Sequence, residues 1–188
     1  VPMFHCNGWC YPWTIPMLNG KTVCLRNIDV KKIFDLIDKY KVTHFGGAPI
    51  ILNMITGASE SDRKKLKHNV NVLTAGAPPP SIIFKKMKDL GFEVMHVYGL
   101  TETYGHVTQC AWNDGWNEFD EEKQNEIKAR QGVRYPNTEG VTIMDPETMK
   151  EVPRDGKTIG EIMIRGNVVM KGYFRDKAAT DKAMSGGW

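Results

Sequence analysis

Apolar residues at positions 30, 33, 34 and 37 recur at the spacing of one helix face. Asp29 stands directly before them and can accept a backbone N–H, so this stretch predicts a capped helix. The run from Val42 to Phe45 is rich in β-branched and aromatic residues and predicts a strand. Gly46 and Gly47 are expected to end that strand.

The same alternation of helix and strand continues up to residue 98. Pro49 suits the first turn of a helix that Gly57 closes, and Ser81 is expected to cap another helix that ends before Gly91. Because strand, loop, helix and strand form the crossover unit of a parallel sheet, the pattern predicts an α/β fold with a mixed parallel sheet and flanking helices. The expected elements are a helix at 49–57, a strand at 70–74, a helix at 81–90 and a strand at 94–98.

The pattern changes in the second half of the chain. Residues 112–130 are rich in acids and amides and predict a loop followed by a short exposed helix. Short strands at 141–144 and 161–165, divided by Asp-Pro and Pro-Arg-Asp-Gly turns, predict a small β-rich subdomain. The expected division is an α/β portion at 1–135, with its sheet within about 1–110, and a β-rich portion at 136–188, with strands from about 138.

Composition narrows the class of protein. With 188 residues, 41% hydrophobic and 25% charged, the chain is typical of a globular protein. Its 25 basic and 22 acidic residues are too balanced to indicate a nucleic-acid partner, and no apolar run approaches the roughly 20 residues that a membrane helix needs. Four irregularly spaced cysteines indicate a reducing compartment, and we expect a cytoplasmic location.

The cluster His5, Cys6 and Cys10 offers three potential metal ligands within six residues. No C-x-x-C pair accompanies it, and no second ligand pair follows at zinc-like spacing. The pattern therefore favours an apolar pocket wall over a metal site.

The segment Val94 to His106, V-M-H-V-Y-G-L-T-E-T-Y-G-H, is the strongest candidate for chemistry. Gly99 is expected to let the chain turn sharply after the strand or come close to a ligand. Tyr98 can offer a ring to a base, Thr101 a hydroxyl to a phosphate, and Glu102 a carboxylate oxygen to Mg²⁺. The alternative is an ordinary strand followed by a polar turn.

The loop that begins Gly76-Ala77-Pro78 follows the preceding predicted strand. Loops after successive parallel strands lie at the same sheet edge, where open α/β sheets bind ligands. An adenine could therefore sit between this loop and Tyr98. A stiff connector before the next helix is the alternative interpretation.

Four motifs stand in register along the chain: P-M-F-H-C-N-G-W at 2–9, G-A-P-P-P at 76–80, Y-G-L-T-E-T at 98–103, and G-E-I-M-I-R-G-N-V-V-M-K-G-Y-F at 160–174. Together they resemble the AMP-forming acyl-CoA synthetases of the adenylate-forming superfamily, and the resemblance runs nearly end to end. The runs G-W-C-Y-P-W at 8–13, T-E-T-Y-G-H-V-T-Q-C at 101–110 and A-R-Q-G-V-R at 129–134 are most similar to the branch that activates short and medium acids, which includes 3-methylmercaptopropionate–CoA ligase and plant acyl-activating enzymes.

The resemblance implies a role for each matching residue. His5 and Trp9 would line the acyl pocket, with His5 also near the reacting carboxylate, although a histidine packed beside an apolar wall is the alternative for His5. Gly99 is carried over as the turn residue only. The nucleotide ligands implied are Gly76, Ala77 and Pro78 around the adenine and phosphate, Tyr98 on the base, Thr101 at the α-phosphate and Glu102 at Mg²⁺.

The reaction implied is the ATP-dependent activation of a carboxylic acid to an acyl-adenylate and then, with coenzyme A, to an acyl-CoA. The alternative is a non-catalytic module that binds a nucleotide or an acyl chain on the same scaffold. The family's phosphate loop should precede Val1, and its ribose-binding aspartate and C-terminal domain should follow Trp188. We therefore expect an internal part of the large N-terminal domain that is inactive alone; the identity of the acid and the oligomeric state stay open.

Overall fold

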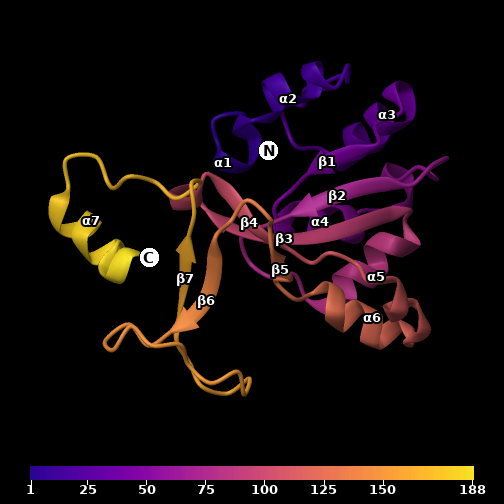
Figure 1. Ribbon diagram of the computed structural model, residues 1–188. Helices are drawn as coiled ribbons and strands as arrows, with labels where there is room; N and C mark the ends of the chain where they lie inside the picture. The colour runs from indigo at the N-terminus through magenta and orange to yellow at the C-terminus, as the bar shows by residue number, and fades with distance from the viewer.

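The computed structural model describes the backbone of residues 1–188 and the side chains of all of them except residues 6 and 7. A five-stranded sheet and a separate two-stranded sheet organise the chain (Figure 1). The helices are α1 (Cys6–Trp9), α2 (Tyr11–Met17), α3 (Val30–Tyr40), α4 (Pro49–Gly57), α5 (Ser81–Asp89), α6 (Glu121–Lys128) and α7 (Lys177–Ala183). The strands are β1 (His44–Gly46), β2 (Val70–Thr74), β3 (Phe92–Leu100), β4 (Gly105–Gln109), β5 (Val133–Arg134), β6 (Gly140–Met144) and β7 (Glu161–Arg165).

The larger sheet has the order β1-β2-β3-β4-β5 and mixes two kinds of pairing. Strands β1, β2 and β3 are parallel, with Phe45 beside Val72 and Val72 beside Val94. Strands β3, β4 and β5 are antiparallel. The α/β fold class and its crossover units are confirmed, whereas β4 and β5 were not predicted.

A single apolar cluster fills the space between the helices and one face of this sheet. Asp29 caps α3 as predicted, because its Oδ1 accepts the N–H of Lys32 at 2.7 Å. The buried face of β2 alternates with exposed Asn71, as a strand with one covered face must. The cluster consists of Phe34, Ile37, Leu52, Ile55, Val70, Val72, Ile83, Phe84, Met87, Phe92 and Val94.

One predicted helix cap is wrong. The cap position of α5 is Pro80, and Ser81 is already the first helical residue, with no side-chain cap hydrogen bond at that end. Pro80 has an extended backbone with ψ 144°, which a proline-rich approach favours, and this leaves the hydroxyl residue one position too late to cap.

The smaller sheet pairs β6 and β7 in antiparallel fashion, with Val141 beside Ile164, close to where the sequence predicted both strands. Helix α7 was not predicted; its cap is Asp176, whose Oδ1 accepts the N–H of Ala179 at 2.9 Å. In Figure 1 this yellow helix lies beyond the small sheet, on the side away from the large one. Among the described residues, every helix is too short or too polar to cross a bilayer.

Candidate active site

The parallel strands β2 and β3 bring two candidate loops to one edge of the sheet. Thr74, the last residue of β2, lies beside His96 of β3. Two residues further along each strand direction stand Gly76 and Tyr98. Gly76 follows the end of β2, whereas Tyr98 lies within β3, two residues beyond its last parallel pair with β2 and opposite Thr108 of β4. Both stand at the carboxyl end of the parallel pairing, which is the usual position of ligands in open α/β sheets.

The Gly76 loop is open to solvent. Gly76 has φ +107°, a conformation that side chains disfavour, and a Cβ added there would meet nothing within 4 Å. Gly76, Ala77 and Pro78 are exposed, while Pro79 is buried and anchors the loop. The backbone of this loop is therefore accessible to a flat ring or a phosphate.

The role predicted for Gly99 needs correction. Strand β3 continues through Gly99 to Leu100, so the turn does not occur at the glycine. The strand register shifts between Tyr98 and Gly99, and a Cβ on Gly99 would collide with the carbonyl oxygen of Gly105. Gly99 is needed because the backbone of β4 approaches it closely, not because the chain turns there.

The turn itself is the short 3₁₀ helix η2 (Thr101–Thr103), and Thr103 organises it. The buried Thr103 hydroxyl accepts the N–H of Leu100 at 2.9 Å and lies 2.8 Å from the carbonyl oxygen of Gly105, to which it donates. Tyr104 then takes a left-handed conformation with φ 57°. Thr103 was not singled out from the sequence, where its signal is a second threonine two residues after Thr101.

Tyr98 and Glu102 are both half-buried at this turn. Burial, and then the charge of Glu102, raise the pKa of the Tyr98 hydroxyl, so this phenol is neutral at pH 7. Glu102 Oε1 accepts a hydrogen bond from the hydroxyl of Tyr173 at 2.9 Å. That hydrogen bond raises the pKa of Tyr173, which therefore remains a protonated donor. Thr101, next to Glu102, is exposed.

Glu102 offers one carboxylate, which suits Mg²⁺ bound together with phosphates. Among the residues whose side chains are described, no group of three or more His, Cys, Asp and Glu could hold a metal by itself. Mg²⁺ is commonly held by one or two carboxylates plus substrate phosphate oxygens and waters. The Tyr173 hydroxyl occupies Oε1 of the Glu102 carboxylate as a hydrogen-bond donor.

Helices α1 and α2 bring the N-terminal segment to the same turn. The thiol of Cys10 lies 3.4 Å from the Tyr104 hydroxyl, and α1 packs on β4. The rings of Trp9 and Trp13 meet edge to face at 4.9 Å, and Trp9 is 46% exposed. His5 is exposed. The segment therefore supplies an aromatic wall next to η2, while the side chain of Cys6 lies outside the described residues.

A second aromatic contact lies on β4. The ring of His106 lies 5.1 Å from the ring of Tyr135. Burial lowers the pKa of His106, so its imidazole is neutral at pH 7. Tyr135, which follows β5, was not singled out from the sequence, because no pattern linked it to the Tyr98 segment.

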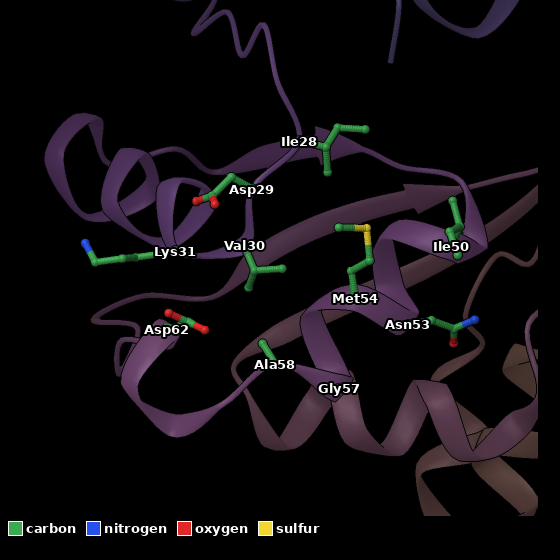
Figure 2. A pocket seen from close by; sticks show the side chains of 10 residues that line it. All are labelled: Ile28, Asp29, Val30, Lys31, Ile50, Asn53, Met54, Gly57, Ala58 and Asp62. Carbon is green, nitrogen blue, oxygen red and sulfur yellow. The ribbon is translucent and has the colours of Figure 1, made fainter.

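A groove of about 580 Å³ lies at a different place in the fold. Figure 2 shows its lining side chains coming from the start of α3, from α4 and from the segment after α4. None of the residues predicted for nucleotide or acyl binding line it. The residues that do are Ile28, Asp29, Val30, Lys31, Ile50, Asn53, Met54, Gly57, Ala58 and Asp62.

The relatives most similar in sequence include plant CoA ligases. The chain is 50% identical over 190 residues to "Acetate/butyrate--CoA ligase AAE7, peroxisomal" of Arabidopsis thaliana, covering 100% of this chain and 33% of that protein. It is 49% identical over 190 residues to "Acetate--CoA ligase CCL3" of Humulus lupulus, again covering 100% of this chain and 33% of the relative. The chain thus spans about a third of the length of the curated relatives it matches.

The predicted cytoplasmic location is wrong by this comparison, since three Arabidopsis thaliana relatives are named as peroxisomal. The prediction failed because sparse cysteines indicate only that the compartment is reducing. They cannot distinguish one such compartment from another, because peroxisomal targeting depends on a short address that a receptor recognises.

Solved structures share the fold. The chain superposes on O-succinylbenzoate coenzyme A synthetase from Bacillus subtilis, in complex with ATP and magnesium ion, with a TM-score of 0.79 at 21% identity, covering 100% of this chain and 36% of that one. The match to the N-terminal domain of FACL13 from Mycobacterium tuberculosis has a TM-score of 0.77 at 24% identity, and it covers 100% of this chain and 44% of that one. The family model for AMP-binding enzymes matches residues 1–174. This chain, with its two loops at the carboxyl edge of a parallel sheet, belongs to the AMP-binding enzyme family.

Proposed function

We propose that this chain is part of an enzyme that activates a short- or medium-chain carboxylic acid with ATP and transfers the acyl group to coenzyme A. The observation that carries the proposal is the arrangement at one sheet edge. The open Gly76 loop follows Thr74, which pairs with His96 two residues before Tyr98, and η2 carries Glu102 directly after β3. The family match and the CoA-ligase names of the relatives support the same reaction.

The proposed reaction has two steps. A carboxylate oxygen of the acid attacks the α-phosphorus of ATP, which forms the acyl-adenylate and expels pyrophosphate. The thiol of coenzyme A then attacks the acyl carbon and displaces AMP. Neither step needs a covalent bond to the protein, so the side chains act by alignment and by stabilising charge.

Each candidate residue has a role in that reaction. Tyr98 stacks on the adenine, Thr101 donates to the α-phosphate, and Glu102 holds Mg²⁺, which neutralises phosphate charge when bound. Gly76, Ala77 and Pro78 border the adenine and phosphate, and Gly99, next to Tyr98, leaves room for the backbone of β4. His5 and Trp9 belong to the acyl side, next to the turn that carries Glu102.

The acid is proposed to be small. Relatives are named for acetate, butyrate and 2-methylpropanoate. Large rings such as Trp9 and Trp13 consume volume beside the turn, which supports a short acyl chain. The full-length protein should be assayed for CoA-dependent AMP release with acetate, butyrate, 2-methylpropanoate, 3-methylmercaptopropionate, hexanoate and benzoate. We expect the short acids, with 3-methylmercaptopropionate among them, to outperform hexanoate and benzoate.

The decisive test is Glu102→Gln in the full-length protein. We expect acid-dependent pyrophosphate release to fall about 100-fold to 1000-fold, because a charged group that stabilises the transition state is lost. The midpoint of thermal unfolding should stay within about 1 °C of wild type, since the side chain is only half-buried and keeps its shape.

The exposed Glu122 of α6 provides the matched control, and Glu122→Gln should leave pyrophosphate release unchanged. A near-normal rate in Glu102→Gln would refute the role of Glu102. ATP binding by the wild-type protein without any pyrophosphate release, across the whole acid panel, would favour a non-catalytic nucleotide-binding module instead.

A further inference from the structure

The stretch after β7 is attached to the Glu102 turn at two points. The hydroxyl of Tyr173 donates to Glu102 Oε1 at 2.9 Å, although the two residues are 71 positions apart. The N–H of Met170 donates to the carbonyl oxygen of Glu102 at 2.7 Å. One contact fixes the backbone of Glu102 and the other fixes its side chain.

Tyr173 is itself held in place by the start of α7. Its backbone N–H donates to the Thr180 hydroxyl at 2.9 Å, and that hydroxyl donates to the carbonyl oxygen of Asp176 at 2.7 Å. Gly172 has φ +146°, and a side chain there would collide with Thr180. The phenol of Tyr173 is therefore directed by a fixed backbone rather than by a flexible loop.

The geometry matters because a glutamate side chain otherwise rotates freely about its terminal bond. A hydrogen bond at Oε1 selects one orientation of the carboxylate and leaves Oε2 to a ligand. Groups that hydrogen-bond to a metal-binding carboxylate orient it and tune its affinity for the ion. Tyr173 is 41% exposed, so its ring contributes little to any core.

We propose that Tyr173 is a positioning residue for Glu102, whose hydroxyl presets the carboxylate that holds Mg²⁺ with ATP. The proposal rests on the proposed function, because it assigns the Glu102 carboxylate to Mg²⁺. It also makes the stretch after β7 part of the nucleotide site, through the Tyr173 hydroxyl.

The test compares Tyr173→Phe with wild type in the full-length protein by calorimetric titration with ATP at a series of Mg²⁺ concentrations. We expect the Mg²⁺ concentration that gives half of the maximal ATP affinity to rise about 10-fold. ATP affinity without Mg²⁺ and the midpoint of thermal unfolding should both match wild type, since phenylalanine keeps the ring. A purely structural role would instead weaken ATP binding at every Mg²⁺ concentration and lower that midpoint, and would overturn the proposal.

Two further variants separate this proposal from the one before it. Phe174→Leu changes the adjacent ring, which is 87% exposed, and should leave the Mg²⁺ requirement unchanged. Tyr173→Phe made together with Glu102→Gln should add nothing to Glu102→Gln alone, because the hydroxyl acts through that carboxylate. An unchanged Mg²⁺ requirement in Tyr173→Phe, with a raised one in Glu102→Gln, would reject the positioning role alone. Failure of Glu102→Gln to alter Mg²⁺-dependent ATP binding would reject the metal role of Glu102, and the positioning role with it.

Discussion

The two sheets of this protein are stabilised in different ways. The five-stranded sheet rests on a cluster in which Phe34, Leu52 and Ile55 are fully buried. The β6–β7 sheet has buried Met144 and Ile164, but Ile143 and Ile162 are 37% and 40% exposed. Because apolar burial is the main favourable term in folding, the large sheet carries most of the stability.

The small sheet relies on turns and on local hydrogen bonds instead. Asp145 accepts the N–H groups of Glu147 and Thr148, and Asp155 accepts those of Lys157 and Thr158. The part of the chain with the weaker core still bears on the proposed site, since it supplies the contacts to Glu102.

The largest expected effect is on the free energy of unfolding. It comes from truncating an isoleucine once in the core that covers the large sheet and once in the small sheet. Ile55→Ala removes a side chain that is 0% exposed and should lower the free energy of unfolding by about 2–5 kcal/mol. Ile162→Ala, in β7 at 40% exposure, should lower it by no more than about 1 kcal/mol. Urea unfolding of the two full-length variants measures both values. Equal losses of unfolding free energy would show that the two sheets are stabilised to the same extent.

A smaller effect is expected from the helix caps. Asp29→Ala removes the cap of α3, which buries Phe34 and Ile37, and should cost about 1 kcal/mol in global unfolding. The matched variant Asp176→Ala removes the cap of α7, a helix with no buried residues, so only local opening of α7 should increase. Urea unfolding measures the global loss, and deuterium uptake measures the local opening of α7. A global loss in Asp176→Ala would show that α7 shares in the core.

The smallest effect concerns acid and the turn at Asp155. Backbone N–H groups of Thr158 and Lys157 lower the pKa of Asp155 from 3.8 to about 2. Since the folded pKa is the lower one, the stabilisation of the turn is complete above about pH 3.8 and is lost as the pH falls through about 2.

Deuterium uptake at residues 156–159 measures that effect. After correction for intrinsic exchange, wild type should show equal protection at pH 6 and pH 4.5, while Asp155→Asn should show less protection at both. The midpoint of urea unfolding should not change in the variant. Protection lost in wild type already at pH 4.5 would contradict the assignment.

Periodicity predicted the elements that bury one face. Helix α3 and strand β2 follow from apolar spacing because their buried positions repeat with the periods of helix and strand. Strand β5 has only two residues, both exposed, so it carries no such signal. Strand β4 exists because η2 folds the chain back on β3, which depends on Thr103 and Gly105 rather than on a local pattern.

The sequence singled out the two loops of the candidate site but not the contact that joins Tyr173 to Glu102. The register of β2 and β3 brings together loops that the sequence had already singled out. The link from Tyr173 to Glu102 joins residues far apart in the chain, and no one-dimensional pattern encodes such a contact. For the same reason Gly99 was assigned to a turn, when the backbone that approaches it belongs to β4.

The hydroxyl of Thr103 ties together both ends of the turn that carries Glu102. A loop that is ordered before its ligand arrives loses little conformational freedom when the ligand binds. In the proposed function, nucleotide association at this edge is accordingly insensitive to loop entropy, so that selectivity depends on the fit of the ligand to a preorganised surface.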